Sequence, residues 1–552
     1  MKSKWLASVL AVGVLSTALI GCSNSNNNGA KEPGATSTAS PDAKLSIVNG
    51  KIEPPVTITT LAYENPAIKF RDGESATDNV FTRWAENTLG VKIKTLWSGG
   101  VTDGSFNTKL KLMLSSGDDL PDVVFLNDKA STDLLVDSGK YMKVEDLADK
   151  YASANYKRSL EEIKSDVDVG SSHNALWIRQ DWLDKLKLKA PTTTEELEAV
   201  MDAFVNQDPD GNGKKDTYAL DFSMKDKFSN ALIGDISWVF GLYGAVPEKW
   251  YPGEDGKLQF GSVQPGIKQG LVKLSEWKDK GYIASDIALH DMAAVVTSVA
   301  SDKVGMVSAP GYFPGYAIPM LRAKKPTAEY KPYPFPQGSN GPAMHSSFST
   351  NARSTLIKKN ISDEALQAYF HLQNTLFDVY DSNDPLHFSG FQEGYDYVVK
   401  DGKIVTDDKE IPGGKLYTYD YMSFGPPAIN SKVRDINLKL ANKEELTDND
   451  RIVVVTLGIN DGSAPFSDLG FEAFKIVNDQ SSSFVKEYYK GPLTSTMSSR
   501  NELLQKMQME TFTKIIYGQS PADEFDKYVN KWKSSGGDTI TKEVNEWYDS
   551  TK

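Results

Sequence analysis

Predicted strands and helices alternate along the chain from residue 56 onward, and this alternation constrains the fold more than any other feature. Residues 56–61 and 91–97 alternate side chains as strands do, and residues 121–125 form the apolar run of a buried parallel strand. Between them, residues 80–89 and 106–116 carry apolar side chains at helical spacing, and a glycine follows each helix. This order is typical of an α/β doubly wound lobe.

A second α/β block follows. Residues 175–179 indicate a strand and residues 181–186 a short helix. Thr193 and Glu196 have the spacing of a capping box at the start of another helix. With 552 residues, at roughly 100–200 residues per domain, the chain can form several domains or two lobes that share crossovers.

The composition excludes several classes of function. The chain carries 61 Lys and Arg against 74 Asp and Glu, a formal charge of −13, which disfavours binding to nucleic-acid phosphates. One cysteine cannot form an intramolecular disulfide or a cysteine-rich zinc site. The five histidines are scattered, and no G-x-S-x-G, H-E-x-x-H, Walker A or G-x-G-x-x-G motif is present. We therefore expect a folded acidic protein that is not an enzyme.

The single cysteine lies at the end of a segment that has the features of an export signal. Lys2 and Lys4 precede an apolar run at residues 5–20, which is shorter than the roughly 20 residues of a membrane-spanning helix and is typical of an export signal. The run closes with Leu-Ile-Gly-Cys22, which resembles the lipobox of bacterial lipoproteins. That resemblance implies a signal peptide at residues 1–21 and a diacylglycerol on the sulfur of Cys22. The alternative is a plain secretory signal with an incidental cysteine.

The segment after Cys22 is predicted to be a flexible tether. Residues 22–44 are rich in Ser, Asn, Gly, Pro, Thr and Ala and cannot bury enough apolar surface to offset the entropy of ordering. We expect a protein that the lipid anchors to the cell membrane on its extracytoplasmic face.

One loop has the oxygen ligands that Ca²⁺ prefers. Its candidate ligands, at relative positions 1, 3, 5, 7 and 9, are Asp208, Asp210, Asn212, the backbone carbonyl of Lys214, and Asp216. Gly213 stands at position 6, where an EF-hand loop turns sharply, but Ala219 replaces the closing glutamate at position 12. The pattern favours a structural Ca²⁺ over a signalling EF-hand. An Asx-rich turn without metal is the alternative.

Three segments carry a resemblance to a known family. Residues 175–220, 111–125 and 501–548, together with the lipobox, resemble the LipO-type extracellular solute-binding lipoproteins of bacterial ABC importers. The family is similar to alginate- and maltose-type binding proteins, and residues 360–500 match it only in patches. In the alginate-binding relatives a similar loop holds calcium, with a glutamate where this chain has Thr217.

The resemblance implies a periplasmic-binding-protein-like fold of two α/β lobes, joined by hinge crossovers with a sugar in the cleft between them. One lobe is expected at residues 45–170 plus about 345–440. The other is expected at residues 171–344 plus about 441–552.

Sugar recognition needs flat aromatic platforms beside planar polar groups, which gives the candidate contacts. Some follow predicted strands, where α/β sheets bind ligands; others lie in segments that resemble cleft loops of the family. The predicted substrate-binding residues are Tyr63, Asn127, Asp128, Trp177, Arg179, Trp238, Tyr312, Glu393 and Tyr397. For Tyr312 packing is the competing interpretation, for Trp177 and Arg179 it is a core face of the strand, and for Trp238 packing in the core is the stronger interpretation.

The expected function is capture of a sugar or oligosaccharide and its delivery to ABC permease subunits by a monomeric lipoprotein. Two alternatives stay open: a surface adhesin that holds glycan without transport, and a glycan-cleaving enzyme that uses an unrecognised pair of acids.

Overall fold

The computed structural model describes residues 45–552 apart from gaps at 66–67, 101–103, 117–118, 166, 168–172, 339–340, 348–352, 385–386, 388–392 and 460–466. The predicted signal peptide, Cys22 and the tether lie outside the described residues. Within these described ranges, no helix is both long enough and apolar enough to cross a membrane.

The predicted alternation at the start of the body is confirmed. Strands β3 (Val56–Glu64) and β4 (Val91–Gly100) pair in parallel, and β5 (Val123–Leu126) lies next to β3. Helix α1 (Val80–Trp84) continues as a π-helical turn and α2 (Ser105–Ser116) packs on β4. The π-helical turn ends at the left-handed Gly90 before β4, so the glycine predicted to end this helix is confirmed, while Gly117 after α2 lies outside the described residues.

A strand from much later in the chain completes this region. Strand β16 (Ser354–Lys358) lies between β5 and β6 (Tyr141–Lys143) and is antiparallel to both. Helix α3 (Lys129–Asp137) packs on β16, and α12 (Asp363–Phe377) packs on β3 and β4. The region is therefore mixed rather than purely parallel, because the chain returns to it after building the second sheet.

The second sheet has the order β12-β7-β11-β8, formed by Tyr330–Tyr333, Asn174–Arg179, Val304–Pro310 and Tyr218–Asp221. Strand β7 is antiparallel to both of its neighbours, and β11 is parallel to β8. All six residues of β7 are buried.

The predicted capping box forms only in half. After α6 (Gln180–Leu186), helix α7 (Thr194–Asn206) begins with Thr193, whose hydroxyl accepts a hydrogen bond from the Glu196 N–H at 3.3 Å. The Glu196 carboxylate bonds chiefly to the residue before the cap: it accepts from the N–H and hydroxyl of Thr192, at 2.8 and 2.7 Å.

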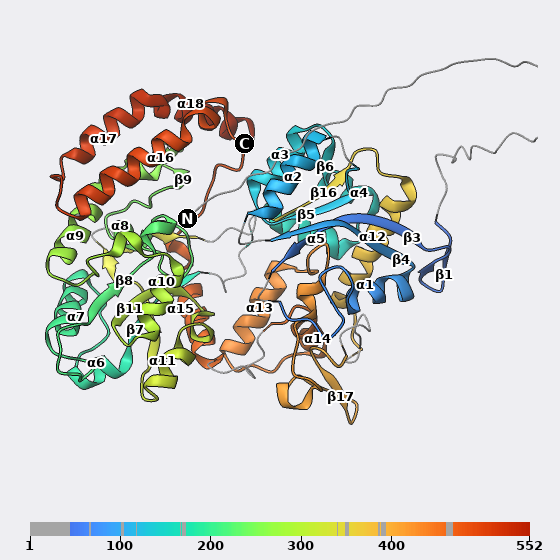
Figure 1. Ribbon diagram of the computed structural model, residues 1–552, viewed down its shortest axis with the longest axis horizontal. Coiled ribbons are helices and arrows are strands. Elements are labelled where there is room, and N and C mark those ends of the chain that lie inside the picture. Colours follow the sequence, from blue (N-terminus) through green and yellow to red (C-terminus); the bar gives the residue numbers. More distant parts are fainter. Residues whose placement is uncertain are drawn as a thin grey trace, which may run out of the picture. The chain divides into compact units, whose positions relative to one another are not determined.

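The C-terminal end is helical. Helices α16 (Ser495–Ile516), α17 (Glu524–Trp532) and α18 (Asp538–Ser550) lie together, and α9 (Pro265–Asp279) packs on α16 (Figure 1). The backbone turns from α17 to α18 through Gly536, at a φ of 127° that suits glycine.

Further helices and strands lie between these elements. The helices are α4 (Glu145–Tyr151), α5 (Ala154–Lys164), α8 (Ser237–Gly241), α10 (Met292–Ala300), α11 (Ile318–Lys324), α13 (Asn430–Ala441), α14 (Asp448–Thr456) and α15 (Ser467–Asp479). The strands are β1 (Ile47–Val48), β2 (Lys51–Ile52), β9 (Trp250–Pro252), β10 (Leu258–Phe260), β13 (Gln337–Gly338), β14 (Gly341–Pro342), β15 (His345–Ser346), β17 (Val398–Lys400), β18 (Lys403–Val405) and β19 (Phe484–Val485).

The buried apolar side chains fall into two groups of clusters. The first group comes from residues 52–160 and 356–454, and the second from residues 175–343 and 473–544. Val453 of α14 packs with Ile436 of α13 in the first group. Apolar residues of α13 and α14 thus pack together before the chain reaches the later residues of the second group.

Candidate functional site

Three of the predicted contacts lie together at the ends of β3 and β5. The Tyr63 hydroxyl accepts a hydrogen bond from the Asn127 N–H at 3.4 Å, and the Asp128 carboxylate caps α3 by accepting from the Ser131 N–H at 2.8 Å. The Tyr63 ring stacks on Phe106 with centroids 4.0 Å apart. Burial, and then the charge of Asp128, raise the pKa of Tyr63 to about 12, so the phenol stays protonated. Asn127 is exposed beside this ring.

A further aromatic residue at this place was missed from the sequence. Trp97, on β4, is half-buried and its ring centroid lies 5.1 Å from that of Phe106. The Lys109 ammonium lies 6.0 Å from the centroid of the Trp97 ring and donates to the Ser98 carbonyl at 2.7 Å. The signal was available, because Trp97 ends the predicted strand at residues 91–97 just as Tyr63 follows the one before it.

Tyr312, one of the predicted contacts, follows β11 in an exposed turn. Its side chain is 41% exposed, and its ring centroid lies 5.6 Å from that of Tyr316, which is 55% exposed. Partial burial raises the pKa of Tyr312 to about 12. The two rings offer adjoining aromatic surfaces of the kind that sugar C–H faces contact. Tyr316 was not among the predicted residues.

Trp177 and Trp238 are fully buried. The Trp177 indole donates to the Ala309 carbonyl at 2.9 Å and packs on Phe313, and Trp238 stacks on Phe335 with centroids 5.3 Å apart. Neither ring has surface to offer a ligand in this structure. Packing, the competing interpretation of these residues, accounts for both.

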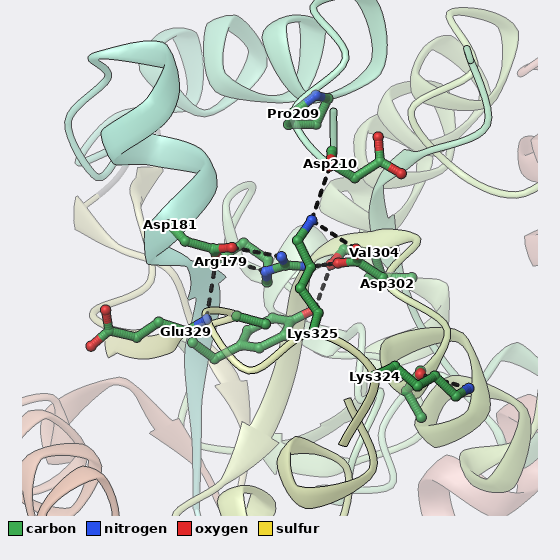
Figure 2. Close-up of polar contacts among 12 residues, drawn as sticks. Arg179, Asp181, Pro209, Asp210, Asp302, Val304, Lys324, Lys325 and Glu329 are labelled. Atoms are coloured by element: carbon green, nitrogen blue, oxygen red, sulfur yellow. Dashed lines mark hydrogen bonds and ion pairs between the residues drawn. The ribbon is translucent and has the colours of Figure 1, made fainter. Parts of the chain in front are cut away.

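Arg179 is also buried, in an ion cluster (Figure 2). Its guanidinium donates to both oxygens of the Asp181 carboxylate, at 2.8 and 2.7 Å, and forms a further ion pair with Asp302. It also lies 4.4 Å from the centroid of the Trp182 ring. Burial opposes the charge of Arg179, but the carboxylates outweigh it and raise the pKa of the guanidinium. The predicted sugar contact is thus occupied by protein groups.

Glu393 and Tyr397 form a tight turn. The Gly394 N–H donates to the Tyr397 carbonyl at 2.7 Å, and the Arg71 guanidinium lies 4.0 Å from the centroid of the Tyr395 ring. Glu393 is exposed, whereas Tyr397 is buried, and burial raises its pKa. Only Glu393 of this predicted pair presents its side chain to solvent.

A tyrosine-rich segment beside this turn was missed. Asp396 is buried and accepts from the Thr418 N–H at 2.9 Å and from the Thr418 hydroxyl; burial raises the pKa of Asp396 to about 7. Tyr417, 42% exposed, and Tyr419 flank Thr418 with ring centroids 6.0 Å apart. Burial raises the pKa of the neighbouring Asp420 to about 6. The alternation Tyr-Thr-Tyr-Asp-Tyr was the available signal.

The loop predicted to bind calcium brings several side-chain oxygen atoms close together. The Asn212 amide donates to Asp210 Oδ2 at 2.6 Å and to Asp216 Oδ1 at 2.9 Å. Asp208 Oδ2 accepts from the Gly213 N–H at 3.1 Å, while Asp208 Oδ1 is a buried acceptor with no hydrogen-bond partner among the residues that the structure describes. An orphaned carboxylate oxygen among other hard oxygens fits a divalent cation in its donor chemistry. Within the described part of the chain, no group of three or more His, Cys, Asp or Glu side chains has a metal-binding arrangement.

Two lysines hold the backbone of the loop. The Lys185 ammonium donates to the carbonyls of Asp208 and Pro209, at 2.8 and 3.1 Å. The Lys325 ammonium donates to the Asp210 carbonyl at 3.0 Å and to Asp302 at 2.9 Å, which ties the loop to the Arg179 cluster (Figure 2).

The two positions that depart from the calcium pattern face the protein interior. The Thr217 hydroxyl donates to the Phe204 carbonyl at 2.8 Å. Ala219 is fully buried in β8. Neither residue offers a carboxylate to the loop.

Comparison with solved structures places the fold among periplasmic-binding-protein-like proteins. FusA of Streptococcus pneumoniae in complex with kestose superposes with a TM-score of 0.58 and 20% identity, over 90% of this chain and 99% of that one. The alginate-binding protein AlgQ2 without calcium ion superposes with a TM-score of 0.57 and 16% identity, over 91% and 100%. A second FusA structure, described as an EF-hand mutant, superposes with a TM-score of 0.57.

Sequence comparison gives the family. Residues 68–369 match the bacterial extracellular solute-binding protein family, and the chain belongs to it. Lipoprotein LipO of Bacillus subtilis is 24% identical over the whole chain and 99% of its own length. FusA is 28% identical over 302 residues, which cover 50% of this chain and 53% of FusA.

Proposed function

We propose that this protein is the substrate-binding lipoprotein of an ABC importer and captures an oligosaccharide between two lobes. The observation that carries the proposal is the set of aromatic side chains beside planar polar groups in a member of this family. Tyr63 lies with Asn127 and Asp128, Tyr312 with Tyr316, and the exposed ring of Tyr417 beside Tyr419 and Asp420. The glycan-binding relatives FusA and AlgQ2 support a carbohydrate ligand.

The proposed contacts differ from the predicted set. We retain Tyr63, Asn127, Asp128, Tyr312 and Glu393 and add Trp97, Tyr316, Tyr417 and Tyr419. Trp177, Arg179, Trp238 and Tyr397 are left out because their side chains are buried among protein groups.

In this proposal the ligand bridges the lobes and shifts the equilibrium between open and closed forms through contacts made only in the closed form. The closed protein then docks on permease subunits as a monomer. The protein releases the glycan unchanged and does not hydrolyse it. The lipid on Cys22 keeps it at the outer face of the membrane, where more than one acyl chain makes anchoring stable.

A calcium ion is proposed for the loop at residues 208–216. Side-chain oxygens of Asp208, Asp210, Asn212 and Asp216 and the Lys214 carbonyl would hold it, and its role would be to stabilise the fold. The orphaned oxygen of Asp208 supports this assignment. Because a metal that binds only the folded state adds stability, chelation with EDTA should lower the melting temperature. Asp208→Asn should abolish that response. A melting temperature of the parent protein that EDTA leaves unchanged would contradict a stabilising calcium ion in this loop.

Binding and uptake can be tested together. A thermal-shift screen of the mature protein against neutral and acidic oligosaccharides should find at least one that raises the melting temperature. Uptake of that oligosaccharide should then fail in a strain that lacks the protein and return with the intact gene. Binding without loss of uptake would favour a surface adhesin, and release of reducing ends by the pure protein would favour an enzyme.

A further inference from the structure

A cavity of 220 Å³ lies beside helix α16, among elements of the second group of buried clusters. None of the described residues that line it belongs to the proposed sugar site. Most of the lining is apolar, so the cavity suits a small ligand with an apolar body. The lining comprises Lys227, Glu248, Trp250, Phe260, Met497, Asn501, Leu504, Gln505, Gln508, Met509, Trp532 and Ile540.

The aromatic part of the lining offers no open ring face. Phe260 packs between Trp250 and Trp532, with its centroid 5.1 and 5.3 Å from theirs. Gly537 also lies against the Trp532 indole, because a Cβ at Gly537 would come within 2.2 Å of the ring. The rings therefore add apolar surface to the cavity, together with the adaptable thioethers of the methionines on α16.

Lys227 has a strained backbone at this cavity. Its φ is 83° and its ψ is 166°, a region that is essentially confined to glycine. Its side chain is exposed, and its ammonium has no hydrogen bond or ion pair with the residues that the structure describes. Such strain persists only where neighbouring groups fix it, and it is concentrated at functional sites such as ligand clamps.

Glu248 fixes the strained turn. One oxygen of its carboxylate accepts from the N–H groups of Phe228 and Ser229, which follow Lys227, at 3.1 and 3.2 Å. The other oxygen accepts from the Gln508 amide of α16 at 2.9 Å. Burial raises the pKa of Glu248, and the positive charge of Lys227 acts against this shift. Both oxygens of Glu248 are thus engaged by protein donors, whereas the Lys227 ammonium is available to a ligand.

Two carboxamides of α16 line the same cavity. Asn501 and Gln505 are four residues apart, so they lie about one turn from each other on one side of the helix. Neither carboxamide has a hydrogen bond within the described ranges of the chain. Their N–H groups and the Lys227 ammonium are donors that suit a carboxylate, and hydrogen bonds between charged groups are the stronger ones.

We propose that this cavity binds a small amphiphilic carboxylate, whose head accepts from Lys227, Asn501 and Gln505 and whose aliphatic body contacts the apolar lining. The volume lies below the roughly 300–1,000 Å³ of sites for larger ligands, so the body is short. This is a second site on the chain, and the inference does not require the proposed function to be correct.

The variants keep shape and change chemistry. Lys227→Met removes the ammonium at similar length and leaves the same demand on the backbone, whereas Lys227→Arg keeps the charge. Lys506→Met makes the same substitution at an exposed lysine of α16 that does not line the cavity, and it is the matched control. Asn501→Leu with Gln505→Met removes both carboxamides at similar volume.

The experiment uses saturation-transfer NMR on the mature protein, with hexanoate as the probe and hexanamide and hexylammonium as its neutral and cationic counterparts. Hexanoate should bind at millimolar concentration, and hexylammonium at least tenfold more weakly. Lys227→Met should weaken hexanoate at least tenfold with an unchanged melting temperature, but change hexanamide by less than twofold. Lys227→Arg and Lys506→Met should bind hexanoate within threefold of the parent. Absence of hexanoate binding, or binding that Lys227→Met leaves unchanged, would overturn the proposal.

Three further arms test the rest of the assignment. Butanoate should bind at least fivefold more weakly than hexanoate, because each buried methylene strengthens binding about fourfold; equal affinities would contradict contact with the apolar lining. The carboxamide double variant should weaken hexanoate at least threefold, and an unchanged affinity would contradict the part assigned to Asn501 and Gln505. Tyr417→Ala should leave hexanoate binding intact, whereas its loss would move the carboxylate to the proposed sugar site and overturn the assignment to this cavity.

Discussion

Strands β3 and β7 were both predicted to carry ligand contacts, yet the structure places them in different environments. Tyr63 of β3 remains partly exposed at the strand end, next to Asn127 and Asp128. Strand β7 lies inside its sheet with every residue buried, and Arg179 at its end is neutralised by carboxylates. The comparison teaches that alternation identifies residues that share a face of a strand. Whether that face meets solvent depends on segments far away in the sequence.

The largest expected effect is on stability, and it follows substitution of Arg179 at the end of the buried strand β7. Arg179→Met leaves the Asp181 and Asp302 carboxylates without their buried partner and should lower the free energy of unfolding by about 3–5 kcal/mol in urea titration. Arg158→Met, which removes an exposed pair with Glu162, should change it by less than about 1 kcal/mol. Equal effects of the two variants would show that the Arg179 cluster does not stabilise the fold.

The buried carboxyl of Asp396 should make stability depend on pH. Its pKa is raised to about 7, so between the ordinary carboxyl value and pH 7 the folded state holds a proton that the unfolded state has lost. This contribution is fully present below pH 4 and is lost as the pH rises to 7. The loss is at most about 1.4 kcal/mol per pH unit.

Asp396→Asn isolates that contribution. Its urea-unfolding free energy, measured from pH 4 to pH 8, should fall less with rising pH than that of the parent. Parallel pH profiles for the two proteins would contradict a raised pKa at Asp396.

Substitution of an exposed residue in the proposed site should change the affinity for the ligand rather than the stability of the fold. Tyr312→Ala removes a partly exposed ring and should weaken oligosaccharide binding by roughly 1–3 kcal/mol by calorimetry, with little change in melting temperature. Tyr488→Ala, at another exposed tyrosine outside the proposed site, is the matched control. An unchanged affinity in Tyr312→Ala would remove Tyr312 from the site.

The smallest effect on ligand affinity is expected for Tyr63, at the end of β3. Tyr63→Phe keeps the ring on Phe106 and removes the hydroxyl that accepts from the Asn127 N–H at 3.4 Å. Because this bond is long and Asn127 is exposed, affinity should fall by no more than about 1.5 kcal/mol in the same calorimetry. A larger loss would indicate that the hydroxyl itself contacts the ligand.

Much of the fold followed from local sequence. Strands β3, β4, β5 and β7 lie where alternation and apolar runs predicted them, because these strands are continuous and Gly90 ends the helical segment before β4. The insertion of β16 between β5 and β6 was not predictable in this way. It depends on pairing between residues more than two hundred positions apart.

The site was predictable where a strand ends in solvent and not where other segments cover it. Tyr63 and Tyr312 keep exposed surface, but Trp177 and Trp238 are covered by Phe313 and Phe335 from later in the chain. Tyr417 was missed because the residues after it form a 3₁₀ turn, so their Tyr-Thr-Tyr-Asp-Tyr alternation does not mark the end of a strand as Tyr63 does.

Calorimetry of the mature protein with the oligosaccharide that gives the largest thermal shift tests the central claim most directly. We predict a saturable complex whose affinity falls at least about fivefold in both Tyr312→Ala and Tyr417→Ala, while Trp238→Phe, a change inside the second group of buried clusters, leaves it within about twofold. Oligosaccharide binding that survives both tyrosine substitutions unchanged would contradict the proposed site.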